Sequence, residues 1–445
     1  MKPSRFPRRE FLKQGLSHAC VLSAMGSQIT AIQKVFAQAD PSIIQDPHFL
    51  LILRTPDGNG GMDSLMGLNP WFDTKTKPSD LYLGPNYHER VLRDIGGTKI
   101  SLGPAAHALA PYVSEFSIVN GLFMGRSDIG HQAATKYLLT TNSGGTFPDQ
   151  GVSIISQASG DPNIITNSRL DIASIKNKFR IDLLNNSNTS ISDNFYKMLS
   201  LYDDSNMFQK ENKIENSKKE QLDFFVKKGE EITLKFKDRD DKTPGLPNNQ
   251  LNKVIAGFAS NYYQMAEVEL SENSLDSHSN FDDSHIAAQT NIWNTVAEII
   301  YRLKETSFQD TETSLYPNYV TILVLNEFGR LPFLNSTQGK DHNLLENSFL
   351  IGGKGIRPSQ VIGGCALYPG SDQYNSKFSG LPIDYRTGNL ISAEVWNAKR
   401  EAFEKDLNVG LIRPENLWMT LQKAWGNKNI ISTHKGRALE GLLKT

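Results

Sequence analysis

Cysteine is scarce in this sequence. The chain of 445 residues holds two cysteines, and because Cys20 lies close to the N-terminus, Cys365 stands alone in the rest of the chain. A single cysteine there excludes a disulfide within the body of the protein, so stability must come from a buried core. Cys365 follows two glycines and has no basic cluster beside it, so we interpret it as a small buried hydrophobic side chain.

The sequence also lacks an excess of charge and a long apolar run. Its 47 basic and 48 acidic side chains nearly cancel, and there is no cationic stripe of the kind that nucleic acid requires, so we expect no nucleic-acid partner. The early apolar stretch over residues 15–32 contains polar residues such as Ser17, His18 and Gln28. It falls short of the ~20 apolar residues that a stable membrane span needs.

The N-terminus carries the features of an export signal. Residues 8–13 read Arg-Arg-Glu-Phe-Leu-Lys, the twin-arginine form, and the mildly apolar stretch follows them. Ala37-Gln38-Ala39 then offers small residues to a signal peptidase. We therefore predict a twin-arginine (Tat) signal peptide over residues 1–39, the Tat export machinery as a partner, and a periplasmic or otherwise exported mature protein.

The body of the chain shows the pattern of an α/β protein. Short apolar runs predict buried strands over residues 48–54, 116–120, 266–270 and 319–325. Helical spacing predicts helices over 105–112, 286–303 and 415–425. Alternation of strands and helices favours a single α/β domain over residues 40–445, in which helices flank a mainly parallel central sheet.

One stretch departs from this pattern. Residues from about 205 to 249 carry alternating lysine and glutamate with few apolar residues, and the breaker Thr-Pro-Gly-Leu-Pro follows at 243–247. We interpret the stretch as a charged helical excursion on the surface and not as a second domain.

Acidic and imidazole side chains cluster where predicted strands end. Asp63 follows the first strand and His131 follows the second; Asp276 and His278 come after the third. The carboxyl edge of a sheet is where α/β proteins gather their ligand sites. Carboxylates and imidazoles without cysteine suit zinc, manganese or magnesium, and a pair of such ions can activate an ester. The pattern predicts one or two divalent metal ions.

The sequence resembles a known family, the exported bacterial proteins grouped as domain of unknown function 1501, which are related in fold to alkaline phosphatases and sulfatases. The resemblance covers most of the chain outside the charged excursion. It is carried by Leu53-Arg54 with Gly60-Gly61-Met62-Asp63, by Asp276-Ser277-His278-Ser279-Asn280, by Asn326-Glu327-Phe328-Gly329-Arg330, by Lys340-Asp341-His342, and by Gly352-Gly353-Lys354-Gly355 with Val361-Ile362-Gly363-Gly364.

The resemblance implies an alkaline-phosphatase-like fold and a set of metal ligands. These ligands would be Asp63, Asp276, His278, Glu327, Asp341 and His342. By analogy, Asp276, His278 and His342 would hold one ion. Asp63 would hold another together with Glu327, or with Asp341 in its place.

Some positions depart from the family pattern. Gly130-His131-Gln132 stands where family members usually have Ser-His-Phe, so a candidate nucleophilic hydroxyl is missing. Ser127 could replace it, or a metal-activated water could attack instead. His131 would be a catalytic acid–base group or a ligand.

Two functions remain open at this point. The first is an exported metal-dependent hydrolase of phosphate or sulfate esters, acting on a small anionic ester substrate. The alternative is a non-catalytic periplasmic binding protein that keeps the fold but has lost turnover, which the missing hydroxyl at Gly130 favours.

Overall fold

The structure is a computed structural model, and it covers the chain in segments. It describes residues 47–55, 62–64, 67–68, 81–84, 86–124, 130–140, 212–242, 248–261, 265–270, 275–367, 378–424 and 437–444. The predicted signal peptide over 1–39 and the candidate nucleophile Ser127 lie outside these residues.

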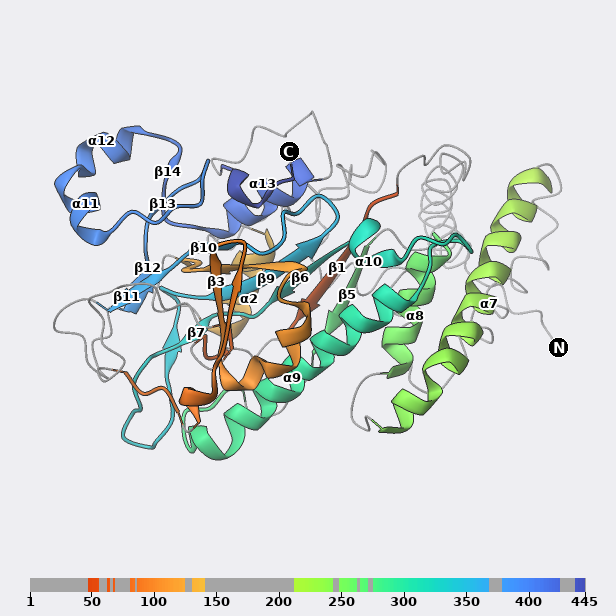
Figure 1. Ribbon diagram of the computed structural model, residues 1–445, viewed down its shortest axis with the longest axis horizontal. Helices are drawn as coiled ribbons and strands as arrows, with labels where there is room; N and C mark the ends of the chain where they lie inside the picture. The colour runs from red at the N-terminus through yellow and green to blue at the C-terminus, as the bar shows by residue number, and fades with distance from the viewer. Residues whose placement is uncertain are drawn as a thin grey trace, which may run out of the picture.

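A six-stranded sheet forms the centre of the described fold, in the order β10-β4-β9-β6-β1-β5 (Figure 1). Its strands are β1 (Phe49–Arg54), β4 (Phe116–Asn120), β5 (Met265–Glu269), β6 (Val320–Leu325), β9 (Ser348–Gly353) and β10 (Val361–Gly363). The strands predicted at 48–54, 116–120, 266–270 and 319–325 are confirmed to within one residue at each end. Apolar runs found them because β1, β4 and β6 are buried along their whole length.

The α/β class is confirmed, but the sheet is mixed, so the prediction of a mainly parallel sheet is wrong. β10 pairs parallel with β4, and β1 pairs parallel with both β5 and β6. β9 runs antiparallel to both of its neighbours, β4 and β6. The connection from β6 to β9 contains only the short strands β7 (Gly329–Arg330) and β8 (His342–Asn343). Without a crossover helix, the chain returns beside β6 in the opposite direction.

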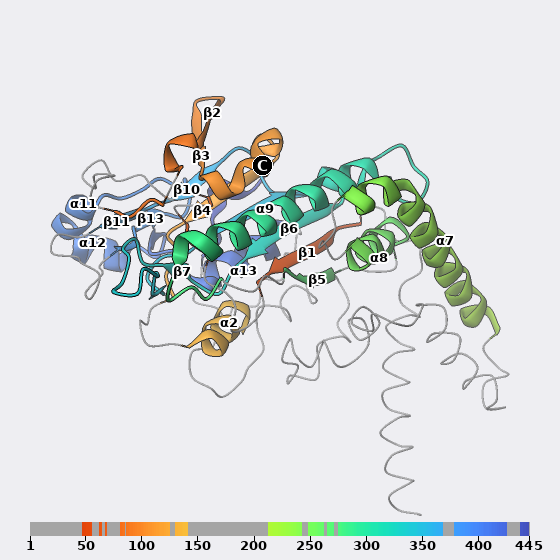
Figure 2. The same ribbon diagram turned by 90° about the horizontal axis from the view of Figure 1, so that it is seen from below.

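Helices cover both faces of this sheet (Figure 2). The long helix α9 (Phe281–Glu305) and the 3-10 helix η3 (Pro104–Tyr112) pack on one face, and α2 (His131–Thr140) and α13 (Pro414–Ala424) pack on the other. α9 connects β5 to β6, which lie on either side of β1, so the predicted helix over 286–303 is confirmed as the crossover of a β-α-β unit. The helices predicted at 105–112 and 415–425 are also confirmed within one residue.

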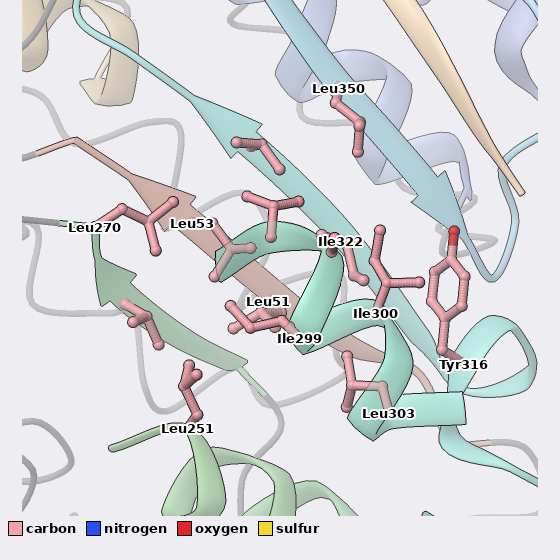
Figure 3. Packing of buried hydrophobic residues seen from close by; sticks show 14 of the residues in the cluster. Leu51, Leu53, Leu251, Leu270, Ile299, Ile300, Leu303, Tyr316, Ile322 and Leu350 are labelled. Carbon is pink, nitrogen blue, oxygen red and sulfur yellow. The ribbon is translucent and has the colours of Figure 1, made fainter. Parts of the chain in front are cut away.

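Alternating side chains divide the core into two layers. In β1, Leu51 and Leu53 face α9 and pack with Ile322 of β6 and Ile300 of α9 (Figure 3). Leu50 and Ile52 of β1 point to the other face, where they belong to a second hydrophobic cluster that includes Trp418 of α13. This alternation follows from the strand period of two, and it also decides which face the side chains after each strand reach.

The charged excursion contains a long helix. α7 (Asn212–Lys242) packs against α8 (Asn248–Ala259) at one end of the molecule (Figure 1). Phe225, Ile232 and Phe236 of α7 are buried in the cluster that includes α9. Arg302 of α9 reaches Asp240 at 2.5 Å, so an ion pair joins the two helices as well. Residues 205–211 and 243–247 lie outside the described part of the chain.

The remaining elements are short. They are η2 (Tyr87–Glu89), β2 (Val91–Ile95), β3 (Thr98–Leu102), α10 (Leu315–Asn318), β11 (Cys365–Leu367), β12 (Phe378–Gly380), β13 (Ile383–Asp384), α11 (Ala393–Ala398), α12 (Arg400–Lys405), β14 (Val409–Gly410) and η4 (Glu440–Leu442). Cys365 is buried, as predicted. None of the helices in the described segments is both long and apolar enough to cross a membrane.

Candidate metal centre

Three segments that are distant in the chain meet beyond the carboxyl edge of the sheet. His131 is the first residue of α2, Asp276 and His278 precede α9, and His342 lies in β8, which pairs with β7. One ligand atom each from His131, Asp276 and His342 lies within 4.8 Å of the other two. Among the described residues, this is the group of histidine and acidic side chains arranged closely enough to hold a metal ion.

A buried carboxylate orients His131. The Nδ1 of His131 lies 2.5 Å from Oε2 of Glu327, whose side chain is fully buried. Thr135, one helical turn along α2, donates to the other oxygen of Glu327 at 3.2 Å. With Nδ1 held, Nε2 of His131 faces Oδ2 of Asp276 at 3.4 Å. A carboxylate behind a histidine is the usual support of a metal-binding imidazole, since it selects the tautomer and the ring orientation.

A second carboxylate–histidine pair adjoins the first. His278 Nδ1 lies 2.7 Å from Oδ1 of Asp341, and its Nε2 lies 3.0 Å from Nε2 of His342 and 3.2 Å from Oδ1 of Asp276. The side chain of His278 is 48% exposed, whereas that of His131 is 18% exposed. The cluster therefore opens to solvent on the His278 side.

Asp276 is the acidic centre of the cluster. Its Oδ1 accepts from Nη2 of Arg330 at 2.8 Å and lies 3.2 Å from Nε2 of His342. Burial alone would raise the pKa of Asp276, but the hydrogen bonds from Arg330 and His342 outweigh it and lower the pKa to about 2. The carboxylate is therefore ionised at neutral pH.

His342 has the character of a neutral ligand. Burial and the nearby guanidinium of Arg330 lower its pKa to about 4. The buried ring of Phe328 lies 4.3 Å from the His342 ring and 5.0 Å from the His131 ring, so it forms an apolar floor beneath both. A neutral imidazole is the form that coordinates a metal.

Backbone contacts hold these segments in place. A Cβ on Gly339 would lie 2.0 Å from the carbonyl carbon of His278, so only glycine allows the two backbones to approach so closely. The Nδ2 of Asn335 bridges the His278 carbonyl and Oδ1 of Asp341, each at 3.0 Å. Arg330 adds bonds from its guanidinium to the carbonyls of Leu275 and Lys340.

Asp63, which the resemblance assigns to the metal site, has another partner. Its carboxylate forms a buried ion pair with Lys340, and the Lys340 Nζ also donates to the Tyr82 carbonyl at 2.8 Å. Gln289 of α9 bonds both to the backbone N–H and to the carbonyl of Asp63, at 3.0 and 2.8 Å. Asp63 therefore lies outside the group of His131, Asp276 and His342.

Sequence reasoning overlooked several of these contributors. The position of His285, seven residues beyond His278, looks accidental in the sequence, yet His285 is buried, accepts from the Asp63 N–H at 3.2 Å, and lies 3.0 Å from Ser277 Oγ. His285 and Gln289 stand four apart at the start of α9, a spacing that places them on one helix face, but the predicted helix began at residue 286 and so left His285 out. Arg330 and Thr135 carried no such signal.

The donor set fits a divalent cation. Ligand atoms about 2.0–2.1 Å from a tetrahedral zinc lie roughly 3.3 Å apart. His131 lies 3.4 Å from Oδ2 of Asp276 and His342 lies 3.2 Å from its Oδ1, so each oxygen of the carboxylate has an imidazole at about that distance. One ligand atom from each of the three residues lies within 4.8 Å of the other two, so small shifts would bring them around one ion. Imidazole nitrogens with one carboxylate and no thiolate suit zinc or manganese. His131, Asp276 and His342 are the residues that would hold the ion, with His278 beside them.

Comparison with known families gives one match. The profile of the family described as protein of unknown function (DUF1501) matches residues 124–371. The chain belongs to this family. Comparison with curated proteins and with solved structures finds none that matches the chain. The DUF1501 region contains every residue of the cluster, from His131 to His342, whereas Asp63 lies outside it.

Proposed function

We propose that this DUF1501 protein is a metal-dependent hydrolase of phosphate or sulfate esters with an alkaline-phosphatase-like fold. The observation that supports the proposal is the convergence of His131, Asp276 and His342, with Glu327 behind His131. The position at the carboxyl edge of an α/β sheet is the usual place for a catalytic site. The part-exposed imidazoles leave the cluster accessible to a small substrate.

Each residue has a role in this proposal. A divalent cation bound there supplies a Lewis acid that polarises an ester oxygen. Asp276 brings the permanent negative charge that attracts the cation, and Arg330 fixes the orientation of that carboxylate. Two of the roles expected from the sequence are exchanged: His131 is a ligand, and His278 is the acid–base candidate in its place. Asp341 orients Nδ1 of His278, whose imidazole is the most exposed of the three.

The attacking group has two candidates. Ser127 lies four residues before His131 in the sequence, at the carboxyl side of β4, and would act as a nucleophilic hydroxyl. A water molecule activated by the cation would need no hydroxyl at this position. Replacing Ser127 with alanine separates the two: a serine nucleophile predicts loss of turnover with metal binding intact, and a water nucleophile predicts little change.

The proposal includes export through the Tat pathway to the periplasm. Its support is the twin-arginine sequence at residues 8–13 and the small residues at 37–39. Replacing both Arg8 and Arg9 with lysine should retain the precursor in the cytoplasm, which cell fractionation measures.

The deciding experiment compares metal content with turnover. The purified full chain should contain zinc or manganese by elemental analysis and should hydrolyse an aryl phosphate or an aryl sulfate. Asp276→Asn should lose both properties, while Asp310→Asn, which changes an exposed carboxylate at the α7 end, should keep both. Metal bound at full stoichiometry by Asp276→Asn would contradict the assignment of this residue as a ligand.

A non-catalytic binding protein is the second candidate. Two observations favour it: Lys340 forms an ion pair with Asp63, and Arg330 forms one with Oδ1 of Asp276. Cationic side chains therefore already neutralise two of the predicted ligands. A binding protein predicts no turnover of either ester, and it predicts that Asp276→Asn leaves partner or glycan binding unchanged.

A further inference from the structure

A row of buried polar side chains crosses the central sheet just beyond its carboxyl edge. Asn120 pairs with Ser348 in the β4–β9 ladder. Extending the β6–β9 register places Asn326 opposite Ser348. Extending the β1–β6 register places Thr55 beside Asn326, and the Thr55 N–H donates to the Leu325 carbonyl. The four side chains therefore stand on adjacent strands, about 4.8 Å apart.

All four point to the face that α9 covers. In β1, Leu51 and Leu53 belong to the cluster on that face, so Thr55 continues the alternation. The same alternation places Asn326 on the face of Val324 and Ser348 on the face of Leu350, and both of these apolar residues belong to that cluster. The histidine cluster is reached from the opposite face, because Glu327 follows Asn326 by one residue and bonds to His131 of α2.

Glu346 joins the row from the connection that leads into β9. Its side chain is fully buried, and Oε1 accepts from Ser64 at 2.6 Å and from Ser348 at 3.2 Å. Burial raises the pKa of Glu346 to about 7, with an opposing contribution from Ser64. Gly329 lies against the other oxygen, because a Cβ there would be 2.6 Å from Oε2.

Several of these polar atoms have no hydrogen-bond partner among the described residues. They are Thr55 Oγ1, Asn120 Nδ2, Asn326 Oδ1 and Glu346 Oε2, and the buried Cys365 thiol adjoins the Glu346 carboxylate. A buried polar atom without a partner loses its hydration without compensation, and four in one row are a concentration that a folded protein rarely tolerates without an occupant. Three of the four are oxygens, and the one titratable group in the row is a carboxylate.

We propose that this row is a second, buried cation site, separate from the histidine cluster, which takes a hard oxygen-binding cation of the calcium and magnesium class. Glu346 is its charged ligand, and Asn326 and Thr55 supply neutral oxygens. The carbonyl, hydroxyl and carboxylate oxygens among these atoms are donors that such cations prefer. Burial raises the pKa of the adjoining Cys365 thiol, so it stays protonated and is no competing ligand. The site does not depend on the proposed hydrolase activity.

The test isolates this row from the histidine cluster. The full chain carrying His131→Ala and His342→Ala is titrated with Ca²⁺ alone and with Mg²⁺ alone by calorimetry, and its melting temperature is followed. One of the two ions should bind with a stoichiometry of one and raise the melting temperature. Adding Glu346→Gln, which keeps the side-chain size and an acceptor for Ser64, should weaken binding at least tenfold.

Two further variants keep the test decisive. Thr55→Val removes an oxygen that has no partner, so it should fold normally while weakening the binding of the ion several-fold. Glu440→Gln changes a carboxylate that is 40% exposed in a surface ion pair, and it should leave binding unchanged. Absence of calcium and magnesium binding in the His131→Ala/His342→Ala chain would mean that only ordered water fills the row and would overturn the proposal, as would equal affinity with Glu346→Gln.

Discussion

Glu327→Gln tests whether the carboxylate behind His131 supports a metal ligand. In the native chain Oε2 holds His131 Nδ1 and Oε1 accepts from Thr135, so the carboxylate takes two donors. Glutamine can still accept from Nδ1 with its carbonyl and donate to the Thr135 hydroxyl with its amide. The geometry survives, and the negative charge behind the imidazole is lost.

The expected loss follows from that difference. Removing the outer carboxylate of a metal-binding histidine costs about 10–100-fold in affinity, or about 1.4–2.8 kcal/mol. We expect the lower end for Glu327→Gln, since the hydrogen bonds remain, and the upper end for Glu327→Ala. Thr135→Val is the matched control and should change the affinity less than about threefold, because the bond to Oε2 is untouched.

Competition with a chelating indicator for Zn²⁺ measures these affinities directly. Equal affinity in Glu327→Gln and the native chain would show that His131 does not bind the ion. A loss well above about 1000-fold would show instead that Glu327 is itself a ligand, since that exceeds an indirect effect.

Three further predictions concern stability and positioning. Lys340→Met removes the cation paired with buried Asp63 and should lower the free energy of unfolding, measured in urea, by about 3–5 kcal/mol. Adding Asp63→Asn should restore part of this loss. An unchanged midpoint of urea unfolding would refute the pairing. Gly339→Ala should displace the backbone at His278 and weaken Zn²⁺ binding at least tenfold, while the circular dichroism spectrum stays native. An affinity equal to that of the native chain would show that the backbone at His278 can shift without disturbing the site. Burial lowers the pKa of His48 to about 3, below its usual 6.5, so between these values the unfolded chain binds a proton that the folded chain does not. The free energy of unfolding should therefore fall as the pH drops below about 6.5, by about 1.4 kcal/mol per pH unit. His48→Gln should flatten this dependence, and an unaltered slope would exclude His48 as its source.

The sequence predicts the strands and helices whose apolar residues follow a clear period. β1, β4 and β6 are continuous apolar runs because both faces of the sheet are covered by helices. β9 was not predicted, because its apolar core of three residues is followed by Gly352 and Gly353. Strand direction has no local signature, so the antiparallel course of β9 could not be read from the chain.

The candidate site is predicted only in part, for a related reason. Asp276, His278 and His342 stand out because acidic and imidazole groups follow predicted strands, and the structure brings all three together. The partners of Glu327 and Asp63 are set by tertiary contacts across 196 and 277 residues, which no spacing rule records. In particular, nothing in the sequence indicates that Lys340 forms an ion pair with Asp63.

Consecutive residues at the end of β6 separate two chemical environments. Asn326 and Glu327 point to opposite faces because a strand alternates its side chains. Glu327 thus supports a nitrogen-rich cluster that is open to solvent on the α2 face, while Asn326 enters a sealed, oxygen-rich row on the α9 face. A slip of one residue in the pairing of β6 would exchange the two side chains and place a carboxylate in the row and an amide behind His131. The register of β6 against β1 and β9 therefore determines the chemistry on both faces, so the short apolar strand is as necessary to the candidate sites as the residues that line them.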